Sequence, residues 1–219
     1  MTQKLSGPML PPAAGGMPRQ LVVLLHGYGA DGNDLIDLGR HWAGLLPEAL
    51  FVAPNAPEPC AGNPFGFQWF ALALDRTISR VSGVPGASGV LANFLGELWA
   101  QTGLAARDTA LVGFSQGAMM ALHVGLALAD PPAGIVSFSG ALVPPEGLGQ
   151  GALPPVCLVH GDADQVVDPG LSATAAQTLR AAGATVGYHV SQGTGHGISP
   201  DGLAFATAFL EECFDAAGS

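Results

Sequence analysis

Short apolar runs alternate with stretches of helical periodicity along this chain, and the alternation limits the folds that it can adopt. Six of the runs are rich in Val, Leu and Ile and are predicted to be strands. Parallel strands buried on both faces read as continuous apolar runs, because helices cover the sheet from both sides. The pattern therefore predicts an α/β fold, a mostly parallel central sheet with helices on both faces in a three-layer sandwich. The expected strands are residues 20–27, 49–57, 110–114, 133–140, 155–161 and 185–193.

Helices are expected between these strands and after the last of them. In the first helix, Asn33 or Asp34 can serve as the N-cap. Residues 54–70 contain too much Pro and Gly for either regular structure, and a loop of this length is often functional. Residues 70–89 look irregular as well. One face of the first helix is expected to carry Leu35, Leu38, Trp42 and Leu45, and the later helices are expected within 89–103, 118–129, 168–183 and 199–214.

Length and charge narrow the class of protein further. A chain of 219 residues suits one domain, predicted for residues 20–219, behind an arm of residues 1–19 that is flexible or forms an edge strand. No apolar run reaches the ~18 residues of a membrane span, and the first residues lack the apolar core of a secretory signal, so a cytoplasmic protein is expected. A net charge of −10 with only seven Lys and Arg residues argues against a nucleic-acid partner. The three cysteines show no disulfide or metal spacing and are expected to be buried: Cys60, Cys157 and Cys213.

Polar clusters follow four of the predicted strands. They read "HGYGADG", "GFSQG", "HGDADQVVD" and "GTGHG". The carboxyl ends of parallel strands meet at one edge of the sheet, and ligands bind at that edge. The four clusters are therefore expected to form one site.

Ser115 lies between two glycines in "GFSQG", the pattern GxSxG. This pattern is typical of a nucleophile elbow, in which a strand turns sharply into a helix and exposes the serine hydroxyl. An ordinary turn in a glycine-rich chain is the alternative. The strand predicted before Ser115 and the apolar helix predicted after it favour the nucleophile.

A serine nucleophile needs a base and an acid that orients the base. His196 is the expected base because it lies in a glycine-rich loop directly after the last strand, although it could also be a turn histidine in water. His26 is the main rival, but it would reverse the chain order of serine, acid and histidine. Asp162 and Asp164 both follow the fifth strand, and the residues alone do not decide between them.

Acyl transfer also needs donors for an oxyanion. The residue after the nucleophile supplies one backbone N–H, which here belongs to Gln116. The other is expected from Tyr28, because Gly27 and Gly29 free the backbone around it. A plain glycine-rich turn is the alternative for that loop.

With these clusters in place, the chain resembles the phospholipase/carboxylesterase family of the α/β-hydrolase fold, which includes bacterial carboxylesterases and acyl-protein thioesterases. The resemblance covers residues 20–214 and rests on "LHGYGADGNDL", "GFSQGAMMAL", "HGDADQVV" and "GTGHGI". It implies Ser115 as nucleophile, His196 as base and Asp164 as the orienting acid, with the amides of Tyr28 and Gln116 as oxyanion donors. The resemblance further implies that the chain hydrolyses carboxylic esters without a metal or cofactor. Some branches of the family hydrolyse thioesters or lysophospholipids instead. A homodimer is compatible with the resemblance.

Two features depart from the family pattern. Tyr28 stands where many members carry leucine, and residues 70–89 look short and irregular.

The aromatic residues of "FGFQWF" are expected to wall an acyl or alcohol pocket, with the core as the alternative: Phe65, Phe67, Trp69 and Phe70. The sequence thus predicts a serine carboxylesterase for short-acyl or aryl esters. The alternatives are an acyl-protein thioesterase or lysophospholipase and, in another class, a ligand-binding module without catalysis.

Overall fold

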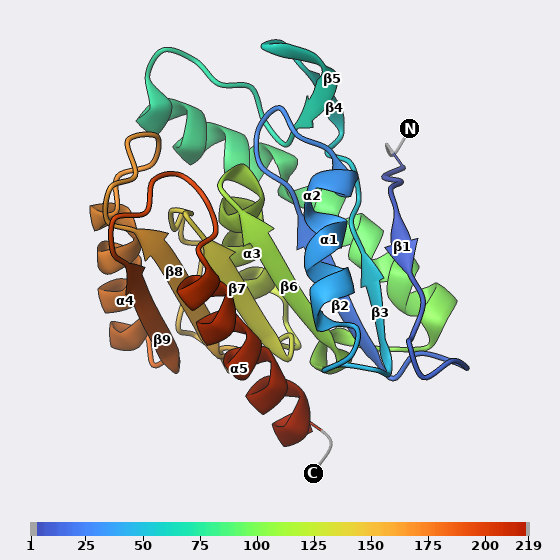
Figure 1. The fold of residues 1–219 in the computed structure, drawn as a ribbon. Coiled ribbons are helices and arrows are strands. Elements are labelled where there is room, and N and C mark those ends of the chain that lie inside the picture. The colour runs from blue at the N-terminus through green and yellow to red at the C-terminus, as the bar shows by residue number, and fades with distance from the viewer. Residues whose placement is uncertain (1–3, 218–219) are drawn as a thin grey trace.

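The computed structural model describes residues 4–217 and is built on one seven-stranded sheet. The strands lie in the order β1-β3-β2-β6-β7-β8-β9 (Figure 1), and all neighbours are parallel except β1 and β3. All six predicted strands are present, and β1 adds an edge strand from within residues 1–19. The strands are β1 (Met9–Leu10), β2 (Gln20–Leu25), β3 (Ala49–Val52), β6 (Thr109–Phe114), β7 (Gly134–Phe138), β8 (Val156–Gly161) and β9 (Val186–Ser191).

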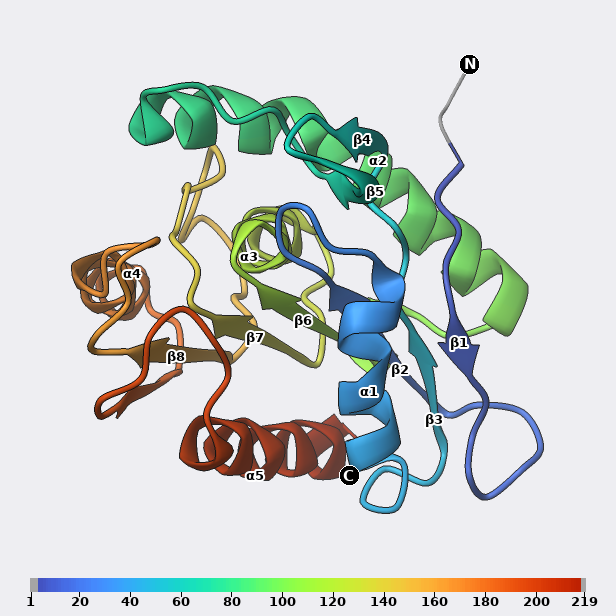
Figure 2. The same cartoon turned by 45° about the horizontal axis from the view of Figure 1, so that its top comes forward.

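Helices cover the sheet on both faces, which confirms the predicted three-layer α/β architecture. One face carries α1 (Gly32–Trp42) and α5 (Pro200–Ala217), as Figure 2 shows. The other carries α2 (Arg76–Thr102), α3 (Gln116–Ala127) and α4 (Gly170–Ala181). A short 3-10 turn, Ala106–Asp108, leads into β6.

The strands alternate their side chains between two separate cores. In β2, Leu21, Val23 and Leu25 pack against α2 and α3. Val22 and Leu24 point to the other face, where they pack against α1 and α5. This burial on both faces explains why the strands read as unbroken apolar runs.

Two segments expected to be irregular are regular. Within residues 54–70 an antiparallel hairpin forms from β4 (Glu58–Cys60) and β5 (Asn63–Gln68), so the prediction of a structureless loop was wrong. The helix expected at residue 89 begins at Arg76, after Asp75, whose carboxylate accepts the amides of Thr77 and Ile78. At Gly83 of this helix glycine is a packing requirement, because a Cβ there would lie 2.6 Å from the ring of Phe70.

Smaller corrections concern the first helix. Its N-cap is Asp31, which accepts the amide of Asn33 at 2.8 Å, and neither Asn33 nor Asp34 takes that place. Leu45 lies beyond the end of the helix and is exposed. The last helix, α5, covers the range expected for it and buries Leu210 and Phe214. All three cysteines are free and buried, as predicted. Among residues 4–217, no helix combines the length and apolar character that a membrane crossing requires.

Candidate active site

Ser115 lies at the carboxyl end of the central strand β6, one residue before α3. Its φ of 54° is rare for a residue with a side chain and marks the sharp strand-to-helix turn. Both flanking glycines are required by close approach. A Cβ on Gly113 would lie 2.3 Å from the backbone of Gly117, and one on Gly117 would lie 1.9 Å from the carbonyl oxygen of Leu25.

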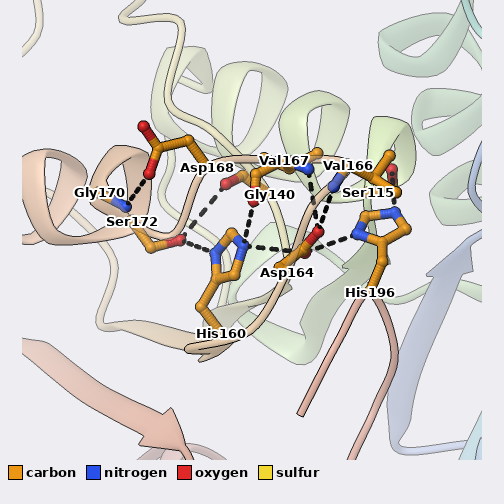
Figure 3. A network of polar contacts seen from close by, with 10 residues as sticks. All are labelled: Ser115, Gly140, His160, Asp164, Val166, Val167, Asp168, Gly170, Ser172 and His196. Atoms are coloured by element: carbon orange, nitrogen blue, oxygen red, sulfur yellow. Dashed lines mark hydrogen bonds and ion pairs between the residues drawn. The ribbon is translucent and has the colours of Figure 1, made fainter. Parts of the chain in front are cut away.

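Three side chains from three strand ends form a hydrogen-bonded row at this turn (Figure 3). His196 Nε2 lies 3.1 Å from Ser115 Oγ, and His196 Nδ1 lies 2.7 Å from Asp164 Oδ2. The ring of Phe114 supports the imidazole, with the two ring centroids 4.8 Å apart. A base held in this way can take a proton from the serine hydroxyl while the carboxylate stabilises the imidazolium.

The structure separates the two aspartates that the sequence left open. Asp164 is buried and faces His196. Asp162 is exposed and accepts the amide of Gly193 at 2.6 Å instead. Only Asp164 is therefore in a position to orient the imidazole.

Four donors converge on the Asp164 carboxylate. Oδ1 accepts the amides of Val166 at 2.8 Å and Val167 at 3.0 Å, while Oδ2 faces His196 and His160. Burial acts to raise the pKa of this carboxyl group, but the hydrogen bonds from His196 and the two amides outweigh it and lower the pKa. The group is therefore held as a carboxylate.

His160 is the second histidine that contacts Asp164, and its place at a strand end was the one feature in the sequence that could have pointed to this contact. Its Nε2 lies 3.1 Å from Asp164 Oδ2 and 3.0 Å from the carbonyl oxygen of Val167. Two acceptors at one nitrogen require the proton on Nε2. Nδ1 lies 2.6 Å from Ser172 Oγ. Burial lowers the pKa of His160, which favours the neutral ring.

The rival base, His26, is occupied elsewhere. Its Nδ1 lies 2.7 Å from the carbonyl oxygen of Gly27, and its Nε2 accepts the amide of Ala56 at 2.9 Å. Burial lowers the pKa of this ring too. His26 thus fixes the loop after β2, and the place beside Ser115 belongs to His196.

Tyr28 and Gln116 both line the same cavity as Ser115 and His196. Gln116 is the first residue of α3, where a helix leaves its amides without intrahelical acceptors. Next to Tyr28, the Gly29 amide donates to the carbonyl oxygen of Phe67 at 2.9 Å. The Gln116 side chain has a further role that the sequence did not reveal: Oε1 accepts the amide of Trp69 at 3.0 Å, and Nε2 donates to the carbonyl oxygen of Phe70 at 2.8 Å.

The cavity has a volume of about 600 Å³ and opens beside Ser115. Of the four aromatic residues expected in its wall, Phe70 lines it. Trp69 is a core residue with 1% exposure, and its Nε1 donates to the carbonyl oxygen of His26. Phe67 packs against the core, and Phe65 is 87% exposed. Phe65, Phe67 and Trp69 are not among the residues that line this cavity, and a role for them in substrate binding stays a prediction.

A second hollow, of about 670 Å³, lies at the amino ends of the strands and is lined by Arg107, Pro155 and Phe209, far from Ser115. Residues 4–217 bring together no three His, Cys, Asp or Glu side chains in a way that could hold a metal ion.

Comparison with known proteins gives consistent matches over most of the chain. The model of the phospholipase/carboxylesterase family matches residues 13–214. Esterase YpfH of Escherichia coli K12 is 31% identical over 193 residues, which cover 88% of this chain and 82% of that protein. Acyl-protein thioesterase 1 of Saccharomyces cerevisiae is 30% identical over 215 residues, which cover 89% of this chain and 92% of that protein. The crystal structure of esterase PE8 superposes with a TM-score of 0.92 at 56% identity, covering 96% of this chain and 99% of the other, and the α/β-hydrolase fold is confirmed.

Proposed function

The chain belongs to the phospholipase/carboxylesterase family, and from that membership we propose that it is a serine carboxylesterase that works through an acyl-enzyme. Enzymes of this family are carboxylic ester hydrolases, and the named relatives are esterases and acyl-protein thioesterases. The finer steps below rest on the geometry of the cavity.

Ser115 Oγ attacks the ester carbonyl carbon while His196 Nε2 takes the hydroxyl proton. The negative charge that develops on the carbonyl oxygen is stabilised by the backbone N–H groups of Tyr28 and Gln116. His196 then gives the proton to the leaving alcohol, and water repeats the sequence on the acyl-enzyme. Asp164 keeps the Nδ1 proton of His196 in place throughout.

The observation that carries this proposal is the unbroken row from Ser115 through His196 to Asp164, with separations of 3.1 and 2.7 Å. It occurs at a serine whose backbone is held at a φ of 54°. A ligand-binding module has no need of a strained serine with a base and a buried carboxylate behind it.

A fluorophosphonate probe and p-nitrophenyl esters test the proposal. The wild-type chain should be labelled at Ser115 and should hydrolyse p-nitrophenyl acetate and butyrate, and Ser115→Ala should lose labelling and about 10⁶-fold in kcat. An unlabelled wild-type chain, or a Ser115→Ala variant that keeps its activity, would overturn it. The wild-type chain without turnover but with ester binding would identify a binding module.

The thioesterase alternative is favoured by relatives such as the yeast acyl-protein thioesterase 1. Paired oxygen esters and thioesters of the same acyl group, in a series from acetyl to palmitoyl, separate the two activities. A lysophospholipid substrate in the same series tests the remaining branch. The preference for short-acyl or aryl esters, the cytoplasmic location and the homodimer stay predictions.

A further inference from the structure

Two arginines line the cavity beside Ser115, in a chain that is otherwise strongly acidic. Arg76 and Arg80 lie on the first turns of α2, four residues apart and so on one side of the helix. The chain has a net charge of −10 and only seven Lys and Arg residues. Two of these seven are therefore at the candidate active site.

These two arginines differ from most of the others in having no carboxylate partner. Arg19 pairs with Glu48, Arg40 with Asp37, and Arg107 with Asp108, while Arg180 donates to the carbonyl oxygen of Val186. Within residues 4–217, no carboxylate lies within 4.0 Å of the guanidinium of Arg76 or Arg80. The side-chain contact of Arg80 is a long one of 3.5 Å to Thr77 Oγ1.

The cavity wall around them is mainly apolar. Phe70, Leu72 and Met119 line it, and Asp34 is the one acidic side chain among its described lining residues. Asp34 lies in the first turn of α1, so the described lining of the cavity holds two cations and a single carboxylate. A guanidinium presents a planar set of donors that matches a carboxylate or a phosphate and does little for a neutral alkyl chain.

We propose that Arg76 and Arg80 form a subsite for an anionic group at the end of the substrate. The preferred substrate is then a carboxylic ester whose apolar arm ends in a carboxylate or a phosphate. The proposal rests on the proposed ester hydrolysis at Ser115 and adds the class of substrate. The net negative charge of the chain repels anions at long range, so the attraction is local to the cavity mouth and is weakened by salt.

Two matched substrate pairs test the subsite and show whether it binds a carboxylate on the acyl arm or a phosphate on the alcohol arm. The first pair is p-nitrophenyl hydrogen adipate and its neutral methyl ester, with the charge on the acyl arm. The second is 1-butanoyl lysophosphatidic acid and monobutyrin, with the charge on the alcohol arm. The measured quantity is the ratio of kcat/KM for the charged member to that for the neutral member.

The double variant Arg76→Gln/Arg80→Gln should lower this ratio about tenfold for at least one pair, because exposed charge pairs are individually weak and two are removed. The matched control Arg107→Gln, at the amino end of the sheet, should keep the wild-type ratio. Raising NaCl from 20 to 500 mM should lower the wild-type ratio relative to that of the double variant, because salt screens the long-range repulsion in both chains but weakens a local attraction only where the two arginines are present.

A change confined to the adipate pair assigns a carboxylate on the acyl arm, and one confined to the phosphate pair assigns the alcohol arm. Equal ratios in the wild-type chain and the double variant for both pairs, in variants with wild-type melting temperature, would overturn the subsite. Labelling of Ser115 by the fluorophosphonate reports the proposed hydrolase chemistry separately. A labelled enzyme with unchanged ratios therefore refutes the subsite alone.

Discussion

Replacing Asp164 by asparagine should slow ester hydrolysis by about 10⁴-fold, for a reason that the backbone determines. The amides of Val166 and Val167 both donate to Oδ1, at 2.8 and 3.0 Å. An asparagine must therefore keep its carbonyl oxygen at that position. Its NH₂ group is then placed where Oδ2 now accepts from His196.

An NH₂ group at that point forces the wrong tautomer on the base. It lies 2.7 Å from His196 Nδ1 and can only donate to it, so the imidazole proton must move to Nε2. Nε2 faces Ser115 Oγ at 3.1 Å and, once protonated, cannot accept the hydroxyl proton. A 10⁴-fold loss corresponds to about 5.4 kcal/mol of transition-state stabilisation.

Steady-state hydrolysis of p-nitrophenyl butyrate measures the effect as kcat/KM. The matched control is Asp162→Asn, because Asp162 carries the same side chain two residues away but is exposed and contacts Gly193. We expect that variant to stay within about threefold of the wild type, as exposed substitutions usually do. A loss of less than tenfold in Asp164→Asn, or a larger loss in Asp162→Asn, would refute the reasoning.

Two further predictions concern stability. Burial lowers the pKa of both His26 and His160 in the folded chain, so below about pH 6.5 the unfolded chain binds protons that the folded chain does not. The free energy of unfolding should therefore fall as the pH drops below about 6.5, by up to about 1.4 kcal/mol per pH unit for each ring. Urea denaturation at pH 7.5, 6.5 and 5.5 measures this, His160→Gln should reduce the slope, and a flat profile would contradict it. Gln116→Ala leaves the Trp69 amide and the Phe70 carbonyl unpaired, so the free energy of unfolding should fall by about 1–3 kcal/mol for each group. The exposed control Gln192→Ala should lower it by less than about 0.5 kcal/mol. Equal losses in the two variants would contradict the role given to Gln116.

The sheet and the location of the site could be predicted because both depend on short-range patterns. Apolar β-branched runs specify buried strands, and parallel topology brings their carboxyl ends together. Ser115 follows from this arrangement together with the GxSxG pattern, and His196 from its loop after the last strand and the chain order of serine, acid and histidine. The residues alone could not decide between Asp164 and Asp162 as the acid, because the choice depends on how the amides of Val166 and Val167 turn one carboxylate inward.

The segment from 54 to 89 could not be predicted because two of its glycines, Gly66 and Gly83, serve packing between distant elements. Gly66 lies where a Cβ would come 2.0 Å from the carbonyl oxygen of Gly29, so this glycine lets the β4–β5 hairpin pair with the loop after β2. Gly83 similarly makes room for the ring of Phe70 against α2. Judged by local propensity, these glycines indicate a loop. Their presence is explained instead by the close tertiary contacts at Gly66 and Gly83.

The β4–β5 hairpin and the two residues that follow it are bonded to both segments that carry the proposed oxyanion donors. On the Tyr28 side, the Gly29 amide donates to Phe67, and Asn63 Nδ2 donates back to the Gly29 carbonyl oxygen at 2.8 Å. On the other side, the Gln116 side chain holds the backbone that follows β5. Because a displacement of about 1 Å at such donors can cost about 10²-fold in rate, we expect this hairpin to influence turnover through the position of the two proposed donor amides. Phe70 and the first turns of α2 line the cavity beside Ser115, so under the proposed function we expect them, and not the hairpin, to contact the substrate.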